Sequence, residues 1–294
     1  MRILITGAKG QLGKWLVKIL KEGKSETGDI PKEYLGAQIT AWDVDEFDIT
    51  DKQSVLNAGE FDIIFNCAAY TNVNKCEEEE ELAYRINAEG VENLALLAEK
   101  TGAKLVHIST DYVFDGEKQG EYLEDDERCP VSAYGRTKCA GEEKIESTCK
   151  KHFIIRTAWL YGYLGGNFVK TIRKIATENE SIRVVADQFG NPTNVNDLAH
   201  HMLLLALTDK YGIYHCTGKG TCSWHDFATE IVKVFGIECD VKKCTTEEYP
   251  TPAKRPKNSA LSHKNLEKAV GDNMRDWKEA LLCFAQNVDK ESLK

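Results

Sequence analysis

The sequence has no apolar run long enough to cross a membrane and no room for an export signal at its start. A bilayer-spanning helix needs about 20 apolar residues, whereas the most apolar helical stretch, residues 202–207, is far shorter. A strand-like run over residues 2–6 begins directly after Met1 and leaves no space for a leader segment. We therefore expect a cytoplasmic protein that makes no contact with a membrane.

Paired cysteines and an excess of positive charge are also lacking. The 10 cysteines are scattered and include no CxxC pair, which favours reduced thiols over a disulfide framework. The net charge is −9 and the pI is about 5.4. Because such a surface repels phosphodiester backbones and anionic lipids, we expect no nucleic-acid partner.

The 294 residues are 42% hydrophobic and 29% charged, a composition typical of a folded globular protein. Short apolar runs near residues 3–5, 38–42, 63–65, 105–108 and 153–155 alternate with helical patterns. This alternation predicts an α/β fold with a doubly wound parallel sheet of the Rossmann type. Residues 23–36, rich in Gly, Ser, Thr and Asp, look like a surface insertion.

The pattern becomes less regular after residue 160, which indicates a second lobe. We expect residues 1–160 to form the dinucleotide-binding domain, with residues 194–217 returning to it through a helix and a strand at 213–216. Residues 161–193 and 218–294 then form a smaller C-terminal α/β substrate lobe. A cleft between two lobes is a common place for a substrate.

A glycine-rich turn follows the first predicted strand and opens a helix. Gly7, Gly10 and Gly13 stand where the backbone must turn tightly and approach a pyrophosphate, with the helix N-terminus facing the anion. Asp43 ends the second strand, and the insertion explains why it lies 30 residues beyond Gly13. Its carboxylate would accept bonds from the adenosine ribose and repel a 2′-phosphate, and Val44 adds no cation. We therefore expect NADH to be preferred, with use of NADPH left open; in the alternative, Asp43 only caps the following turn.

Tyr134 and Lys138 stand four residues apart on one face of a helix that begins shortly after Pro130. A phenol titrates near pH 10, and a neighbouring ammonium would lower its pKa. Ser109 and Thr110 stand at the carboxyl end of the fourth strand, where ligands of doubly wound sheets bind. The Thr110 hydroxyl could then hydrogen-bond a substrate carbonyl that Tyr134 protonates. The alternative makes these hydroxyls simple caps.

With these motifs in place, the chain resembles the extended short-chain dehydrogenases and, within them, the dTDP-4-dehydrorhamnose reductase family. The resemblance spans nearly the whole chain. The matching segments are residues 6–13, 66–71, 109–116 (STDYVFDG), 134–138, 156–162, 187–193 and 255–259.

The resemblance implies roles for individual residues. The implied catalytic residues are Thr110, Tyr134 and Lys138. The implied substrate-binding residues are Thr110, Asp111, Tyr112, Trp159 and Arg255. The residues expected to bind the cofactor are Gly7, Gly10, Gln11, Leu12, Gly13, Asp43, Asp48, Ile49, Cys67, Ala68, Ala69, Tyr70, Asn87, Ser109, Tyr134 and Lys138.

The implied reaction is hydride transfer to the 4-keto carbon of dTDP-4-dehydro-L-rhamnose, which gives dTDP-L-rhamnose. Some relatives are magnesium-linked dimers that use surface carboxylates, but Trp15 stands where we would look for one. We therefore assign no metal-binding residues and leave open both a part for magnesium and a homodimer. Lys254, Arg255 and Arg183 are candidates to pair with the diphosphate of a nucleotide sugar.

Other functions can be weighed on the same residues. Sugar dehydratases of this fold carry Asp-Glu after the Thr, whereas Asp111 is followed here by Tyr112, which argues against dehydration. Another nucleotide-sugar 4-keto reductase or an epimerase/reductase stays open, as does a non-catalytic NAD(P)-binding regulatory subunit. A metal hydrolase built on His200-His201, or on His215 and His225, is disfavoured, because adjacent helical side chains diverge by about 100°. One of the paired histidines should then be apolar-facing and the other on the surface.

Overall fold

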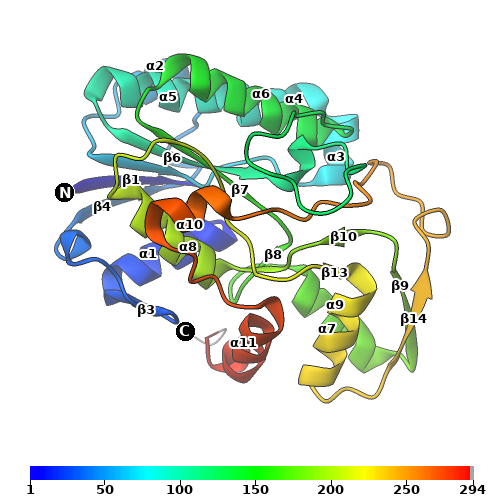
Figure 1. Cartoon of the computed structure of the whole chain (residues 1–294). Helices are drawn as coiled ribbons and strands as arrows, with labels where there is room; N and C mark the ends of the chain where they lie inside the picture. The colour runs from blue at the N-terminus through cyan, green and yellow to red at the C-terminus, as the bar shows by residue number, and fades with distance from the viewer. Residues whose placement is uncertain (292–294) are drawn as a thin grey trace.

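The computed structural model describes residues 1–291 and is organised around a six-stranded parallel sheet (Figure 1). In spatial order its strands are β4 (Gln38–Trp42), β1 (Arg2–Thr6), β5 (Ile63–Asn66), β6 (Lys104–Thr110), β7 (His152–Thr157) and β12 (Gly212–His215). The chain runs from β1 outward to β4 and then returns to place β5 on the other side of β1. The doubly wound parallel sheet is confirmed, and its order reverses between β1 and β5, where such folds bind ligands.

Helices cover both faces of this sheet (Figure 1). One face carries α2 (Lys52–Leu56), α5 (Gly90–Thr101) and α6 (Ala133–Thr148), and the other carries α1 (Gln11–Glu22), α8 (Val195–Ala206) and α10 (Lys264–Val270). The alternation along β1 explains the two layers, since Ile3 and Ile5 join the core beneath α1 whereas Leu4 joins the core beneath α5. Strands that are apolar on both sides require this double cover.

The segment 23–36 lies between α1 and β4, as expected of an insertion. It contains the hairpin β2 (Lys24–Ser25) and β3 (Gly28–Asp29) and the 3₁₀ turn η1 (Lys32–Tyr34). The segment packs on α8, where Tyr34 donates to Leu203 O at 2.8 Å and Ser25 Oγ lies 2.9 Å from His200 Nδ1. The prediction that one of the paired histidines faces solvent is therefore wrong. His200 and His201 are both buried, because the hairpin covers His200.

The second half of the chain adds a group of smaller elements at one end of the sheet (Figure 1). These are β8 (Leu160–Tyr161), α7 (Phe168–Glu178), β9 (Ser181–Val185), β10 (Phe189–Gly190), β11 (Thr193–Asn194), β13 (Cys222–Ser223), α9 (Trp224–Val234), β14 (Asp240–Cys244) and α11 (Trp277–Glu291). Sequence reasoning missed β14, which pairs with β9, and α10, which packs on α8 and β12. The expected return of β12 to the main sheet is found beside β7. The division into two lobes at residues 160, 193 and 217 remains our proposal.

Short helices connect β5 to α5 and β6 to α6. They are α3 (Val73–Glu78), α4 (Glu80–Tyr84), the π-helical turn η2 (Arg85–Glu89) and the 3₁₀ turn η3 (Asp111–Val113). Over residues 1–291, none of the helices combines the length and apolarity needed to traverse a bilayer. In the same range, no three side chains of His, Cys, Asp or Glu gather closely enough to hold a metal ion.

Candidate functional site

The glycine-rich turn brings the loops after β1 and β5 into direct contact. Gly7 has φ +64°, and a Cβ there would lie 2.6 Å from Ala68 N. A Cβ on Gly13 would lie 2.3 Å from Gly7 O, so the first turn of α1 can pack on the loop only with glycine at this position. Gly10, at the N-terminus of α1, supplies no side-chain cap. The amide groups of this first turn therefore suit an anion.

A cavity of about 540 Å³ opens above this turn at the switch point of the sheet. Its lining residues are Gly7, Lys9, Gly10, Asp43, Val44, Phe47, Asp48, Ile49, Thr50, Cys67, Ala68, Ala69, Leu82, Arg85 and Ile86. Eight of the residues expected to bind cofactor are among them. The missed lining residues have ordinary residue types and are brought together only by the fold; they are Lys9, Phe47, Thr50, Leu82, Arg85 and Ile86.

The other residues expected at the cofactor lie outside this lining. They are Gln11, Leu12, Gly13, Tyr70, Asn87, Ser109, Tyr134 and Lys138. The Asn87 amide is occupied by the backbone of Tyr70, at 2.8 and 3.1 Å, and by Thr137 Oγ at 3.1 Å. Ser109 Oγ donates to Glu142 at 2.5 Å, and Gln11 bridges Leu160 O and Asn167. These side chains hold neighbouring elements together in the structure.

Asp43 stands at the edge of the cavity and is bound on both carboxylate oxygens. Lys9 N donates to Oδ2 at 2.7 Å and Val44 N donates to Oδ1 at 2.9 Å. The Lys9 ammonium turns instead to Asp45 and Glu46, at 2.8 and 2.9 Å. Asp43 thus connects the glycine loop to the end of β4. The positive charge of Lys9 in this loop is offset by Asp45 and Glu46.

Tyr134 and Thr110 face each other at the end of β6. Ser132 caps α6 by accepting a bond from Gly135 N at 3.1 Å, which starts the helix just after Pro130 as predicted. A Cβ on Gly135 would lie 2.2 Å from Tyr112 O, so this glycine lets α6 approach η3 closely. The phenol of Tyr134 is half-buried, and the Thr110 hydroxyl interacts with it.

The expected lowering of the pKa of Tyr134 by Lys138 is not found. Burial raises the pKa of Tyr134, the Thr110 hydroxyl partly offsets this, and Asp111 adds to the increase. Lys138 Nζ is held elsewhere, donating to Ile108 O at 2.6 Å and lying 3.1 Å from His107 Nε2. Helical spacing placed the two residues on one face, but the direction of the lysine amine depends on β6.

Asp111 is a buried carboxyl group beside this pair. It is 2% exposed; Oδ1 accepts from Thr110 Oγ at 2.9 Å, while Oδ2 finds no hydrogen-bond partner in the described part of the chain. The nearby Ser259 hydroxyl donates to Phe189 O at 3.3 Å. Burial, only partly offset by the Ser259 and Thr110 hydroxyls, raises the pKa of Asp111 to about 6. The carboxyl therefore titrates close to neutral pH.

We expect Asp111→Asn to be more stabilising at pH 8 than at pH 5, when its free energy of unfolding is compared with that of the unmodified protein at the same pH. Because the pKa of Asp111 is about 6 when folded and near 3.8 when unfolded, stability falls as pH rises between these values, and the loss persists above pH 6. The amide does not titrate, so its advantage should grow by about 3 kcal/mol in total, of which about 1.4 kcal/mol falls between pH 5 and pH 8. Urea unfolding at both pH values measures the difference. Asp115→Asn is the control. Because the Tyr122 hydroxyl lowers the pKa of Asp115, its replacement should change the free energy of unfolding with the opposite dependence on pH. A difference that does not depend on pH for Asp111→Asn would contradict the prediction.

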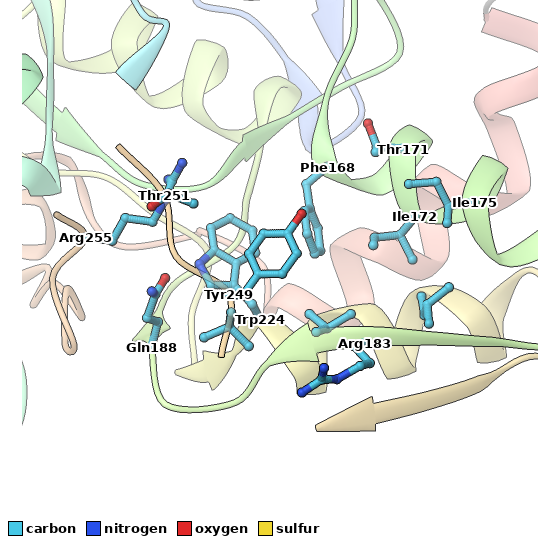
Figure 2. A pocket seen from close by; sticks show the side chains of 13 residues that line it. Phe168, Thr171, Ile172, Ile175, Arg183, Gln188, Trp224, Tyr249, Thr251 and Arg255 are labelled. Carbon is cyan, nitrogen blue, oxygen red and sulfur yellow. The ribbon is translucent and has the colours of Figure 1, made fainter. Parts of the chain in front are cut away.

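A second cavity, of about 380 Å³, lies between α7, β9 and α9 (Figure 2). Aromatic and aliphatic side chains, among them Phe168, Trp224 and Tyr249, line it, and Arg255 and Arg183 stand at its border (Figure 2). Among the residues expected to bind substrate, Arg255 lines this cavity directly. Sequence reasoning missed Trp224 and Tyr249 because no local motif surrounds them.

Contacts link this second cavity to Tyr112 and Tyr134. Arg255 Nη1 donates to the Tyr112 hydroxyl at 2.9 Å, and the Tyr112 and Tyr134 rings meet edge to face at 5.7 Å. Trp159 stacks on Trp224 with ring centroids 3.5 Å apart. Trp159 is also the single non-glycine residue with positive φ, +48°, among those described, and strain of this kind gathers at functional sites.

Comparison with known proteins places this architecture in a family. The model of the RmlD substrate binding domain family matches residues 1–290. The chain belongs to this family. The matched range includes the residues of the glycine turn and those that line the second cavity.

Relatives of the RmlD-family chain share its full length. The spore coat polysaccharide biosynthesis protein SpsK of Bacillus subtilis is 42% identical over 97% of both chains. A solved dTDP-4-dehydrorhamnose reductase of Clostridium acetobutylicum is 46% identical, with a TM-score of 0.92 over 98% of this chain and 100% of that one. The Bacillus anthracis dTDP-4-dehydrorhamnose reductase, solved in complex with NADP, is 40% identical, with a TM-score of 0.89 over 96% and 98% of the two chains.

Proposed function

We propose that this chain is a short-chain dehydrogenase/reductase that uses a nicotinamide cofactor to reduce the 4-keto group of dTDP-4-dehydro-L-rhamnose to dTDP-L-rhamnose. The observation that carries the proposal is the group formed by Thr110, at the end of β6, and by Tyr134 and Lys138, in the first turns of α6. Relatives of 40 and 46% identity are named for this activity. The sugar would lie at the catalytic group and its nucleotide in the aromatic cavity.

The glycine turn fits a dinucleotide. The absence of side chains on Gly7 and Gly13 and the uncapped N-terminus of α1 form a cradle that a Cβ would fill. A reduced nicotinamide, when bound, supplies the hydride that adds to the carbonyl carbon. Asp43 and Asp48 would hold the adenosine end in the 540 Å³ cavity.

The chain's own residues then polarise and protonate the carbonyl. We assign Tyr134 as the proton donor to the carbonyl oxygen, because its raised pKa keeps the phenol protonated at neutral pH. Thr110 has a single hydroxyl proton, which it donates to Asp111 Oδ1 here. To hydrogen-bond the substrate oxygen, this hydroxyl must rotate away from Asp111. Hydride on carbon and a proton on oxygen together convert the ketone into the alcohol.

Substrate-dependent oxidation of NADH tests this function. The purified protein is mixed with NADH and, in turn, with dTDP-, GDP- and UDP-linked 4-keto-6-deoxyhexoses, and the products are identified. We expect oxidation with the dTDP-4-dehydro-L-rhamnose sample and formation of dTDP-L-rhamnose. Cofactor binding without oxidation by any sugar would support a regulatory subunit instead, and a product with a changed configuration elsewhere in the ring would indicate an epimerase.

We further propose that NADH is preferred over NADPH. Asp43 lies in the cavity, and its negative charge opposes a 2′-phosphate. The cation of Lys9 is engaged by Asp45 and Glu46, which leaves Arg85 as the other cation in the lining. The complex of the Bacillus anthracis protein with NADP makes this preference worth measuring.

Asp43→Asn should raise the ratio of kcat/KM for NADPH over that for NADH by about 10-fold, the equivalent of about 1.4 kcal/mol. The amide keeps the bond from Lys9 N and removes the charge. Steady-state kinetics with both cofactors measure the ratio. Asp29→Asn, on the exposed hairpin, is the matched control, and an unchanged ratio in Asp43→Asn would contradict the preference.

A further inference from the structure

A chain of four buried polar side chains runs beneath the cofactor cavity and crosses from β1 to α6. Its members are Thr6, Asn66, His107 and Lys138, and each is at most 1% exposed. Thr6 Oγ donates to Asn66 Oδ1 at 2.7 Å, and Asn66 Nδ2 lies 2.9 Å from His107 Nδ1. His107 Nε2 lies 3.1 Å from Lys138 Nζ. This series of side chains thus ends at Lys138, a proposed catalytic residue.

The backbone amide of Ala68 allows the protons along this series of side chains to be assigned. Ala68 N donates to Asn66 Oδ1 at 3.1 Å, and a backbone N–H is always a donor, so this atom is the amide oxygen. The Asn66 nitrogen must then donate to His107 Nδ1, which carries no proton. Burial and the neighbouring Lys138 hold the pKa of His107 well below its usual value, so the ring is neutral. Its one proton therefore lies on Nε2.

This assignment restricts the charge of Lys138. The Nε2 proton of His107 points at Lys138 Nζ, and an ammonium group offers three donors and no acceptor. The 3.1 Å contact is a hydrogen bond only when Nζ is a neutral amine that accepts from His107 while it donates to Ile108 O at 2.6 Å. Burial acts in the same direction and lowers the pKa of Lys138 to about 8.

The other groups near Lys138 do not demand a positive charge. Glu142, one turn further along α6, raises the pKa of Lys138, but its carboxylate is already paired with Arg156 and Arg128. Tyr134, one turn earlier on α6, is a neutral phenol, and β5 contributes the neutral amide of Asn66. On β6, the contacts to the amine come from His107 and the Ile108 carbonyl.

We propose that His107 is a positioning residue that holds Lys138 as a neutral amine against β6 in the free protein at alkaline pH, and that cofactor binding there draws a proton from solvent onto this amine. The second half of the proposal rests on the proposed function. A dinucleotide brings a diphosphate and ribose hydroxyls, which favour an ammonium and offer it acceptors. The step balances as one solvent proton added to one amine, with no bond between heavy atoms changed.

Nuclear magnetic resonance of the free protein tests the first half without cofactor or substrate. Ring ¹⁵N shifts of His107 should show a bare Nδ1 and a protonated Nε2 from pH 6 to 9. Lys138, followed through its ¹³Cε shift, should titrate well below the other lysines. A proton on Nδ1, or an ordinary lysine titration, would overturn the assignment on the unmodified protein.

Two variants of His107 separate a positioning role from a merely structural one. His107→Phe cannot donate to the amine, so the titration of Lys138 should move up by about one pH unit. His107→Gln retains a donor for Nζ and an acceptor for Asn66, and should leave the titration near that of the unmodified protein. Equal titrations in all three proteins would refute the role of His107.

Calorimetry of NADH binding at pH 9, in buffers of different ionisation enthalpy, tests the second half. We expect close to one proton taken up per NADH bound, close to none at pH 6, and none in Lys138→Met. Uptake that persists in Lys138→Met, or no uptake at pH 9, would overturn this half. A failure of NADH to bind would refute the proposed cofactor and, with it, the uptake step, while the titration of Lys138 would still decide the role of His107.

Discussion

We expect Tyr134→Phe to lower kcat for reduction of the keto sugar by about 100-fold or more, while the dissociation constant of NADH stays within about twofold. The phenol faces the Thr110 hydroxyl at the end of β6, and its loss removes the proposed proton donor to the carbonyl oxygen. The ring itself remains and keeps its edge-to-face contact with Tyr112. Single-turnover measurements of NADH oxidation and fluorescence titration of NADH give the two quantities.

Tyr211→Phe is the matched control for this variant. The Tyr211 hydroxyl bonds to Asp209 at 2.8 Å, at the far edge of the sheet beside β12, so its loss should leave both quantities unchanged. If Tyr134→Phe retained most of the activity, Tyr134 would not be the proton donor. If it lost NADH binding to the same extent as activity, its role would be in holding the cofactor.

Local signals in the sequence predicted the elements that carry the site. The glycine turn follows an apolar strand and opens a helix, and both features are read from neighbouring residues. Pro130 predicted that α6 begins shortly after it, and the structure adds the Ser132 cap, which places Tyr134 in the first turn. Such signals are reliable because each depends on contacts within a few residues.

The other features of the site depend on contacts between segments that lie far apart in the sequence. The direction of the Lys138 amine is set by His107, 31 residues earlier on β6, and no spacing rule connects the two. Trp224, which lines the second cavity, packs against Phe168 and Trp159, two residues that lie far from it in the sequence. Ser109 was expected at the cofactor, yet its hydroxyl donates to Glu142 on α6. Which of several polar partners a side chain selects depends on packing that only the fold supplies.

The ion pair between Glu142 and Arg156 lies in the interior, between α6 and β7. Arg156 Nε and Nη2 donate to the two carboxylate oxygens at 2.9 and 2.7 Å, and the side chains are 1% and 0% exposed. Arg156 Nη1 also donates to Glu124 O at 3.2 Å. The pair joins β7 to α6 one turn beyond Lys138, so it holds the helix that carries the proposed catalytic residues Tyr134 and Lys138.

Arg156→Met should lower the free energy of unfolding by about 3 to 5 kcal/mol, because it leaves the Glu142 carboxylate buried with only Arg128 and Ser109 as partners. The double variant Arg156→Met with Glu142→Leu should recover much of this loss, since two apolar side chains leave no buried charge behind. Arg173→Met, which breaks the exposed pair with Asp289, is the control and should cost less than about 1 kcal/mol. Urea unfolding of the four proteins measures these differences. If Arg156→Met cost no more than Arg173→Met, Glu142 would be stabilised by its remaining partners alone, and the pair could not be what fixes α6 against β7.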